Sequence, residues 1–136
     1  MIRPNVFASV AFALFALPGL AADPGYKIEA PQVIHLKMGQ PASARLTVVP
    51  RADSHVSPDA PVSLTLTASP SVELSKLKLG RADAKETPQK GIQFDFPVAA
   101  KQAGPGSVDA DLVFFLCTEK LCERHKEHVR LDVQAE

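Results

Sequence analysis

Cys117 and Cys122 are the residues of this 136-residue chain whose type and spacing point most directly to chemistry. They are the only two cysteines, and four residues separate them. An apolar run precedes Cys117 and an alternating run follows Cys122, which predicts a turn between two strands. Two thiols placed in this way can form either a structural disulfide or a redox-active dithiol that exchanges with a partner.

The short spacing favours exchange over a purely structural bridge. A four-residue connection between antiparallel strands can bring its flanking residues to the Cα separation of about 4.4–6.8 Å that disulfides require. Closing so short a loop stabilises the folded chain by only about 2 kcal/mol, and a bridge for stability would more usefully join distant segments. Of the neighbouring residues, Glu119 and Glu123 would oppose thiolate formation, while Lys120, Arg124 and His125 would favour it. They do not decide whether a thiolate is favoured.

Other site chemistries have weaker support. Cys117, Cys122, His125 and His128 place four possible zinc or copper ligands within twelve residues. In an extended segment, however, residues 125 and 128 point to opposite faces. The chain has no glycine-rich phosphate loop and no Gly-x-Ser-x-Gly motif. We therefore expect no metal and no cofactor, and the catalytic candidates are the two cysteines.

The N-terminus has the pattern of a secretory signal peptide. Arg3 precedes an apolar run from Val6 to Leu17, and Gly19 and Ala21 satisfy the small-x-small rule for cleavage after Ala21. The run is shorter than the roughly 20 residues of a membrane-spanning helix. We expect a signal peptide at 1–21 and a periplasmic or secreted chain at 22–136 that does not insert into a membrane. That compartment would permit a disulfide.

The remaining chain has the size of one domain. Without Arg3 it carries 14 basic and 15 acidic residues, a net charge near −1. This balance excludes a strong electrostatic footprint for nucleic acid or an anionic membrane.

Alternation of apolar and polar residues dominates that domain. Five runs show a period of two, which is typical of strands with one buried face. They are 42–48, 62–68, 92–98, 108–116 and 129–133. Shorter candidates are 26–28, 33–36 and 72–79, and Pro97 predicts an edge or a bulge in its strand.

Turn residues separate these runs, for example at 87–91 and 104–106. The pattern predicts an all-β, antiparallel immunoglobulin-like β-sandwich of about seven or eight strands. Ten residues are expected in its core: Leu46, Val48, Leu64, Leu66, Phe94, Phe96, Leu112, Phe114, Leu131 and Val133. In the strand before Cys117, Val113 and Phe115 share the other face with the cysteine. This apolar patch is either exposed or covered by a loop and so could mark a contact site, or both faces of a central strand are covered there.

The chain also resembles a known family at these residues. A hydrophobic strand, a cysteine, a short turn, a second cysteine and a final strand are similar to the disulfide-bond corrector family, the N-terminal periplasmic domains of the thiol:disulfide interchange protein DsbD. The resemblance extends to Gln40-Pro41-Ala42 and to the segment from His55 to Pro61. It implies an immunoglobulin-like sandwich in which Cys117 and Cys122 pass electrons from a membrane thiol reductase to thioredoxin-like periplasmic oxidoreductases.

We therefore predict a thiol:disulfide exchange module that relays reducing equivalents through Cys117 and Cys122. The alternative is a non-catalytic binding or structural module with a sealed disulfide, because a sandwich fold does not settle function.

Overall fold

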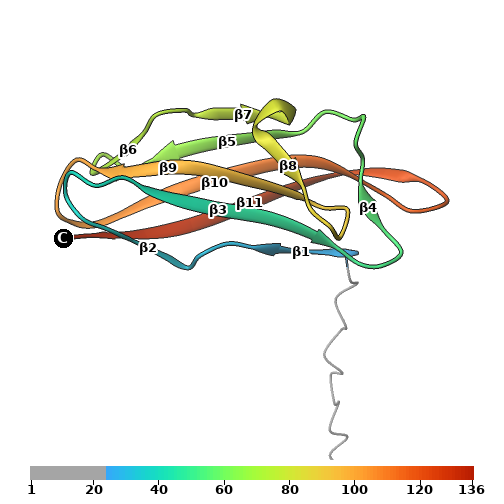
Figure 1. Ribbon diagram of the computed structural model, residues 1–136, viewed down its shortest axis with the longest axis horizontal. Coiled ribbons are helices and arrows are strands. Elements are labelled where there is room, and N and C mark those ends of the chain that lie inside the picture. The colour runs from blue at the N-terminus through green and yellow to red at the C-terminus, as the bar shows by residue number, and fades with distance from the viewer. Residues whose placement is uncertain (1–23) are drawn as a thin grey trace, which may run out of the picture.

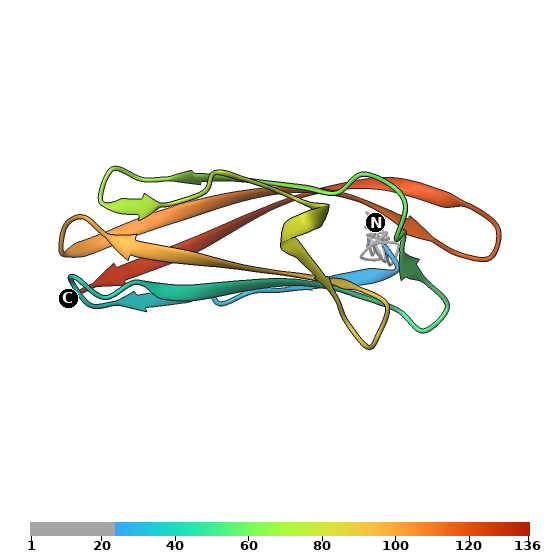
Figure 2. The same cartoon turned by 45° about the horizontal axis from the view of Figure 1, so that its top comes forward.

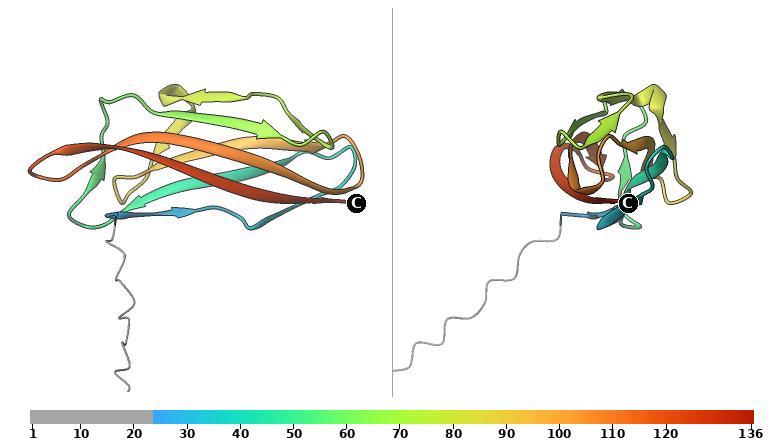
Figure 3. Two further views of the ribbon diagram at one scale, coloured as in Figure 1. Left: turned by 180° about the vertical axis from the view of Figure 1, so that it is seen from behind. Right: turned by 90° about the vertical axis from the view of Figure 1, so that its left-hand side faces the viewer.

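Residues 24–136 are described by a computed structural model, in which eleven strands form two sheets packed face to face (Figures 1 and 3). The predicted signal peptide and its cleavage site lie outside these residues. The predicted all-β sandwich of immunoglobulin-like type is confirmed. Within residues 24–136, no helix has the length and apolar character needed to cross a membrane.

The sheets have five and six strands. The first contains, in spatial order, β1 (Tyr26–Glu29), β3 (Ala42–Pro50), β9 (Ile92–Ala100) and β6 (Val72–Leu74), with β8 (Ala84–Glu86) also paired to β9. The second contains β2 (Val33–Leu36), β11 (Cys122–Ala135), β10 (Gly104–Cys117), β5 (Ser63–Ala68) and β7 (Lys78–Gly80), with β4 (His55–Val56) also paired to β10. A 3-10 turn, η1 (Arg81–Asp83), follows β7.

All five alternating runs form long strands, namely β3, β5, β9, β10 and β11. The run 72–79 differs from the prediction, because it splits into β6 and β7, which belong to different sheets. This split and the short strands β4 and β8 raise the number of strands in residues 24–136 above the seven or eight expected. The sheets are also not wholly antiparallel, since β2 pairs with β11 in parallel.

Pro97 occupies a local gap in its sheet rather than a true edge strand. β9 lies inside the sheet, with β3 on one side. On its other side β8 pairs with residues 92–94 and β6 with residues 98–100. Within residues 24–136, Asp95–Pro97 therefore have no strand partner on that side, and the missing N–H of proline is tolerated there.

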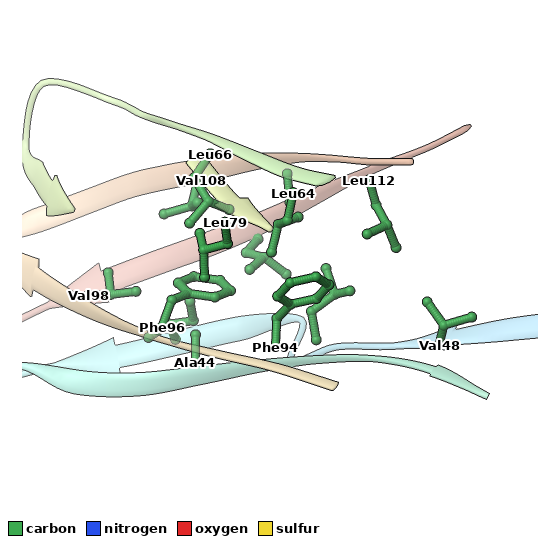
Figure 4. Close-up of a cluster of buried hydrophobic side chains, with 14 of the residues drawn as sticks. Ala44, Val48, Leu64, Leu66, Leu79, Phe94, Phe96, Val98, Val108 and Leu112 are labelled. Atoms are coloured by element: carbon green, nitrogen blue, oxygen red, sulfur yellow. The ribbon is translucent and has the colours of Figure 1, made fainter. Parts of the chain in front are cut away.

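The apolar faces of both sheets meet in one core (Figure 4). All ten predicted core residues are buried, none more than 3% exposed. Phe94 and Phe96 point from β9 toward Leu64, Leu66 and Val108 of the opposite sheet. The apolar residues that alternate with polar ones along each strand thus form a continuous layer between the sheets. This layer is the main stabilising feature of the sandwich.

The β10–β11 hairpin carries the cysteines to one end of the molecule. The two 14-residue strands pair along their whole length, from Gly104 opposite Ala135 to Cys117 opposite Cys122. The tip of the hairpin extends past the neighbouring strands (Figures 1 and 2). β2 pairs only with residues 132–135 of β11. Among the described residues, the outer edge of β11 from 122 to 131 therefore has no strand partner.

Candidate functional site

The candidate site is the tight turn between the two cysteines. The Thr118 N–H donates to the Leu121 carbonyl across the turn, with an N···O distance of 2.9 Å. The backbone N–H groups of Lys120 and Leu121 lie 3.3 and 3.4 Å from the Thr118 hydroxyl oxygen. Thr118 therefore holds the turn closed through both its backbone and its side chain, as short polar residues do in turns.

Cys117 and Cys122 form a disulfide, so the predicted pairing is confirmed. The two residues are directly opposite in the ladder, and their Cα atoms are 4.0 Å apart. This separation is shorter than the predicted range of about 4.4–6.8 Å. The bond joins adjacent strands at the last pair of the β10–β11 ladder.

The two cysteines differ in their access to solvent. Cys117 is 4% exposed, whereas Cys122 is exposed. Leu121, next to the exposed cysteine, is 53% exposed. An incoming thiolate must approach one sulfur along the line of the disulfide. Cys122 is therefore the more accessible of the two cysteines, and Cys117 is the buried one.

β4 borders the buried cysteine. His55 pairs with Cys117 and Val56 pairs with Leu116, and the Ser57 N–H donates to the Phe115 carbonyl at 2.8 Å. Directly opposed residues project from the same face of a sheet. His55 is therefore a neighbour of Cys117. Sequence reasoning gave His55 no role, because a two-residue strand has no periodicity to detect.

A surface hollow of about 570 Å³ lies beside the turn. The segment 50–55 forms one wall, the turn 88–90 a second, and Thr118 and Glu119 of the hairpin a third. The Val56 N–H donates to the Lys90 carbonyl at 2.9 Å and so ties β4 to the second wall. Three segments distant in sequence thus meet beside the turn that joins the two cysteines.

The predicted apolar patch is half covered. Val113 and Phe115 are both of intermediate exposure, on the face of β10 opposite the core. β4 pairs with β10 on one side at this end, and β11 pairs with it on the other. The patch is therefore neither a fully exposed surface nor part of the core.

The inner face of the hairpin has an aromatic cluster that sequence reasoning did not find. Phe114 lies 4.9 Å from Tyr26 in an edge-on arrangement and 5.5 Å from His125 in a stacked one, measured between ring centroids. The Tyr26 hydroxyl donates to the Glu127 carboxylate and so links β1 to β11 across the two sheets. Burial and this carboxylate raise the pKa of Tyr26 above its ordinary value, so the phenol stays protonated.

The possible Cys/His metal site does not assemble. His125 faces inward beside Phe114, whereas His128 contacts Asp111 on the outer face. The expected opposition of residues 125 and 128 is therefore confirmed. Within residues 24–136, no group of three or more His, Cys, Asp or Glu side chains is placed to hold a metal ion.

His128 carries a pH dependence that can be measured. Its Nδ1 lies 2.8 Å from Asp111 and its Nε2 lies 3.2 Å from Asp109, so both nitrogens face carboxylates. The hydrogen bond to Asp111, followed by the charges of Asp111 and Asp109, raises the pKa of His128 above its ordinary value. A raised folded-state pKa stabilises the protein below the unfolded-state pKa of about 6.5, and this contribution is lost as pH rises through the folded-state pKa.

We therefore expect the midpoint of urea unfolding to fall as pH rises from the unfolded-state pKa to the folded-state pKa of His128. The variant His128→Gln should lack this part of the pH dependence. A variant with the same slope as wild type between those two pKa values would contradict the assignment. Because the side chain is exposed, the expected effect is small.

The comparisons with known proteins give no family. No protein-family model matches the chain, and no curated protein matches it. Among solved structures, murine CRIg is 6% identical to this chain with a TM-score of 0.43, and the match covers 82% of this chain and 98% of the CRIg chain. A cohesin module of a Clostridium perfringens family 33 glycoside hydrolase is 8% identical with a TM-score of 0.46, covering 82% and 97%. AggA, the major subunit of an Escherichia coli aggregative adherence fimbria, is 11% identical with a TM-score of 0.42, covering 86% and 98%. Likenesses this distant carry no argument about function.

Proposed function

We propose that this protein is an exported thiol:disulfide exchange module that relays reducing equivalents through Cys117 and Cys122. The observation that carries the proposal is the asymmetric disulfide at the projecting tip of a hairpin, with one cysteine exposed and the other buried. The proposed partners are a thioredoxin-like periplasmic oxidoreductase and a membrane thiol reductase, as the family resemblance implies. No cofactor is required, because the two sulfurs carry the electrons.

The position of the bond argues against a mainly stabilising role. β10 and β11 are already paired over their full length, and the disulfide closes a loop of only six residues at the far end. The chain-entropy contribution of such a loop is about 2 kcal/mol. The stability of the sandwich comes chiefly from the core between the two sheets. The disulfide joins two strands of the same sheet and does not connect one sheet to the other.

Exchange at this site balances as two successive displacements. A donor thiolate attacks Cys122 Sγ, a donor–Cys122 disulfide forms, and Cys117 leaves as a thiolate that takes up a proton. The donor's second thiolate then attacks its own bridged sulfur and releases Cys122, so the module gains two electrons and two protons. In the second half, the Cys122 thiolate attacks an acceptor disulfide, and Cys117 displaces the acceptor as a dithiol.

One observation favours the alternative of a sealed disulfide in a non-catalytic module. Cys117 is nearly inaccessible, at 4% exposure, and so cannot itself meet a partner. The relay and the structural disulfide both allow a buried Cys117, and they differ in what they require of Cys122. A relay requires Cys122 to form a mixed disulfide, whereas a structural bridge does not.

The test is covalent trapping with single-cysteine variants. Cys117→Ser is expected to form a mixed disulfide with a thioredoxin-fold oxidoreductase that lacks its second active-site cysteine, because Cys122 is exposed. Cys122→Ser is expected to trap this probe far less, because Cys117 is buried. The double variant provides the background, and non-reducing gel electrophoresis with mass spectrometry measures the product.

A redox titration supplies the second readout. A labile bond should titrate above about −300 mV, while structural disulfides of secreted proteins typically lie below that value. The relay is rejected if neither single variant traps the probe and the wild-type bond resists reduction while the domain stays folded.

Export is proposed from the leader sequence and has its own test. We expect the protein recovered from the periplasm or the medium to begin near Ala22 or Asp23, because Gly19 and Ala21 precede the predicted cleavage site. Intact-mass measurement of the recovered protein checks this. A mass that retains Met1 would contradict it.

A further inference from the structure

Two cations share the face of the hairpin on which Cys122 lies. Residues 122, 124 and 126 of β11 project from one face, because side chains alternate along a strand. Arg124 is directly opposite Phe115, and Lys126 is directly opposite Val113. Both cations are exposed, and both apolar partners are half-buried. A short apolar strip with a cationic border therefore runs from the exposed cysteine along the outer face of the sheet.

These two cations are not neutralised by the fold. Further along the same face, Asp109 and Asp111 contact His128, and Arg130 lies 3.6 Å from Asp132. Among the described residues, neither Arg124 nor Lys126 has an ion-pair partner within 4.0 Å. The acidic residues of this part of β11 are absent from the face, because alternation sends them to the inner side.

Protection of a free strand edge is not enough to explain this arrangement. Charges of either sign prevent edge-to-edge aggregation, and β11 carries both signs along its open edge. Glu123 and Glu127 lie on the inner face, and the Glu127 carboxylate accepts the Tyr26 hydrogen bond. On this part of β11 the acidic residues 123 and 127 lie on the inner face, so Arg124 and Lys126 give the outer face of the strand next to Cys122 a positive charge.

From this surface we infer, on the basis of the exchange function proposed above, that the partner of this module carries acidic side chains around its reactive cysteine. Arg124 and Lys126 would pair with these acidic groups, while Phe115 and Val113 would contact an apolar part of the partner. Charge complementarity of this kind chiefly accelerates the encounter and selects among partners. In the encounter the partner thiolate attacks Cys122 Sγ, the intermolecular disulfide forms, and Cys117 leaves as a thiolate.

The test uses synthetic peptides as probes. Three reduced peptides of equal length have one cysteine flanked on each side by two glutamates, two glutamines or two lysines. Each is mixed with the oxidised protein, and the mixed disulfide is quantified by quenched mass spectrometry. Each rate is divided by that of the same peptide with hydroxyethyl disulfide, a neutral reference, which removes the effect of the flanking charges on thiolate formation.

At low salt we expect the normalised rate of the acidic peptide to exceed that of the basic peptide by about tenfold. The ratio should fall toward one at about 0.5 M salt, because screening then acts within a few ångströms. Arg124→Glu combined with Lys126→Glu should reverse the order. The neutral double variant, Arg124→Gln with Lys126→Gln, should make the normalised rates of the three peptides equal.

The matched control changes the same amount of charge elsewhere. Lys37→Glu with Lys101→Glu alters two exposed lysines at the opposite end of the hairpin, where Gly104 pairs with Ala135. This control should keep the wild-type order, and circular dichroism should show all variants folded. Two results would overturn the inference while leaving the exchange function intact. One is equal normalised rates for the acidic and basic peptides with the wild-type protein. The other is a loss of the preference for the acidic peptide in the control variant as large as in the Arg124 and Lys126 variants. Failure of every peptide to exchange would overturn both the inference and the exchange function.

Discussion

Replacing Phe114 with alanine is expected to lower the free energy of unfolding by about 3–5 kcal/mol, the usual cost of truncating a buried phenylalanine. Phe114 is 0% exposed and lies on β10, an interior strand of the second sheet. Its ring contacts the rings of Tyr26 and His125, so the truncation removes two aromatic contacts as well as buried area. Urea denaturation followed by circular dichroism measures the change.

The adjacent phenylalanine provides the matched control. Phe115 follows directly in β10 but projects from the outer face, where it is of intermediate exposure. Phe115→Ala should therefore lower stability by clearly less than Phe114→Ala. A loss below about 1 kcal/mol for Phe114→Ala, the usual range for surface positions, would reject the core assignment of Phe114. Equal losses for the two variants would reject the assigned orientation of β10.

The difference between these neighbours could be predicted from sequence because strand periodicity is local. Leu112, Phe114 and Leu116 alternate with Val113 and Phe115, and a period of two assigns each set to one face. The same rule identified the ten core residues, since each lies in a long alternating run. What the rule establishes is the face of a strand, which depends only on neighbours in the chain.

The pairing of strands depends on distant residues and could not be predicted in the same way. The run 72–79 reads as one strand, yet the chain crosses between sheets at Ser75–Leu77, and β6 and β7 pair with different partners. β4 is too short for any periodicity, although it places His55 opposite Cys117. The Tyr26–Glu127 hydrogen bond joins residues 101 positions apart.

The candidate site shows the same division. The sequence predicted that Cys117 and Cys122 would pair, because a short turn between strands constrains their separation. It did not predict which sulfur is accessible, since the burial of Cys117 accompanies its pairing with β4, a strand from another part of the chain. The cationic border at Arg124 and Lys126 is visible in sequence only once the register with Val113 and Phe115 is known.

Replacing Gly91 with alanine is expected to destabilise the protein by about 3 kcal/mol, the upper end of the usual cost of overpacking. A Cβ atom at this position would lie 2.0 Å from the Val48 carbonyl oxygen and 2.9 Å from the Pro50 side chain. The carbonyl belongs to β3, which pairs with β9 one residue beyond Gly91, so neither backbone can move without breaking the ladder. Urea denaturation measures the loss of stability.

Gly80→Ala is the matched control, because a Cβ atom there would meet only the Val62 carbonyl at 4.0 Å, an ordinary contact. It should leave the stability nearly unchanged. The change at Gly91 should also reach the candidate site, because the Lys90 carbonyl next to it accepts the Val56 N–H of β4. Amide hydrogen exchange at Val56 should therefore be faster in Gly91→Ala than in wild type. Equal stability of the two glycine variants would contradict the close approach of β3 and the turn, and unchanged exchange at Val56 would show that β4 holds its place beside Cys117 without that turn.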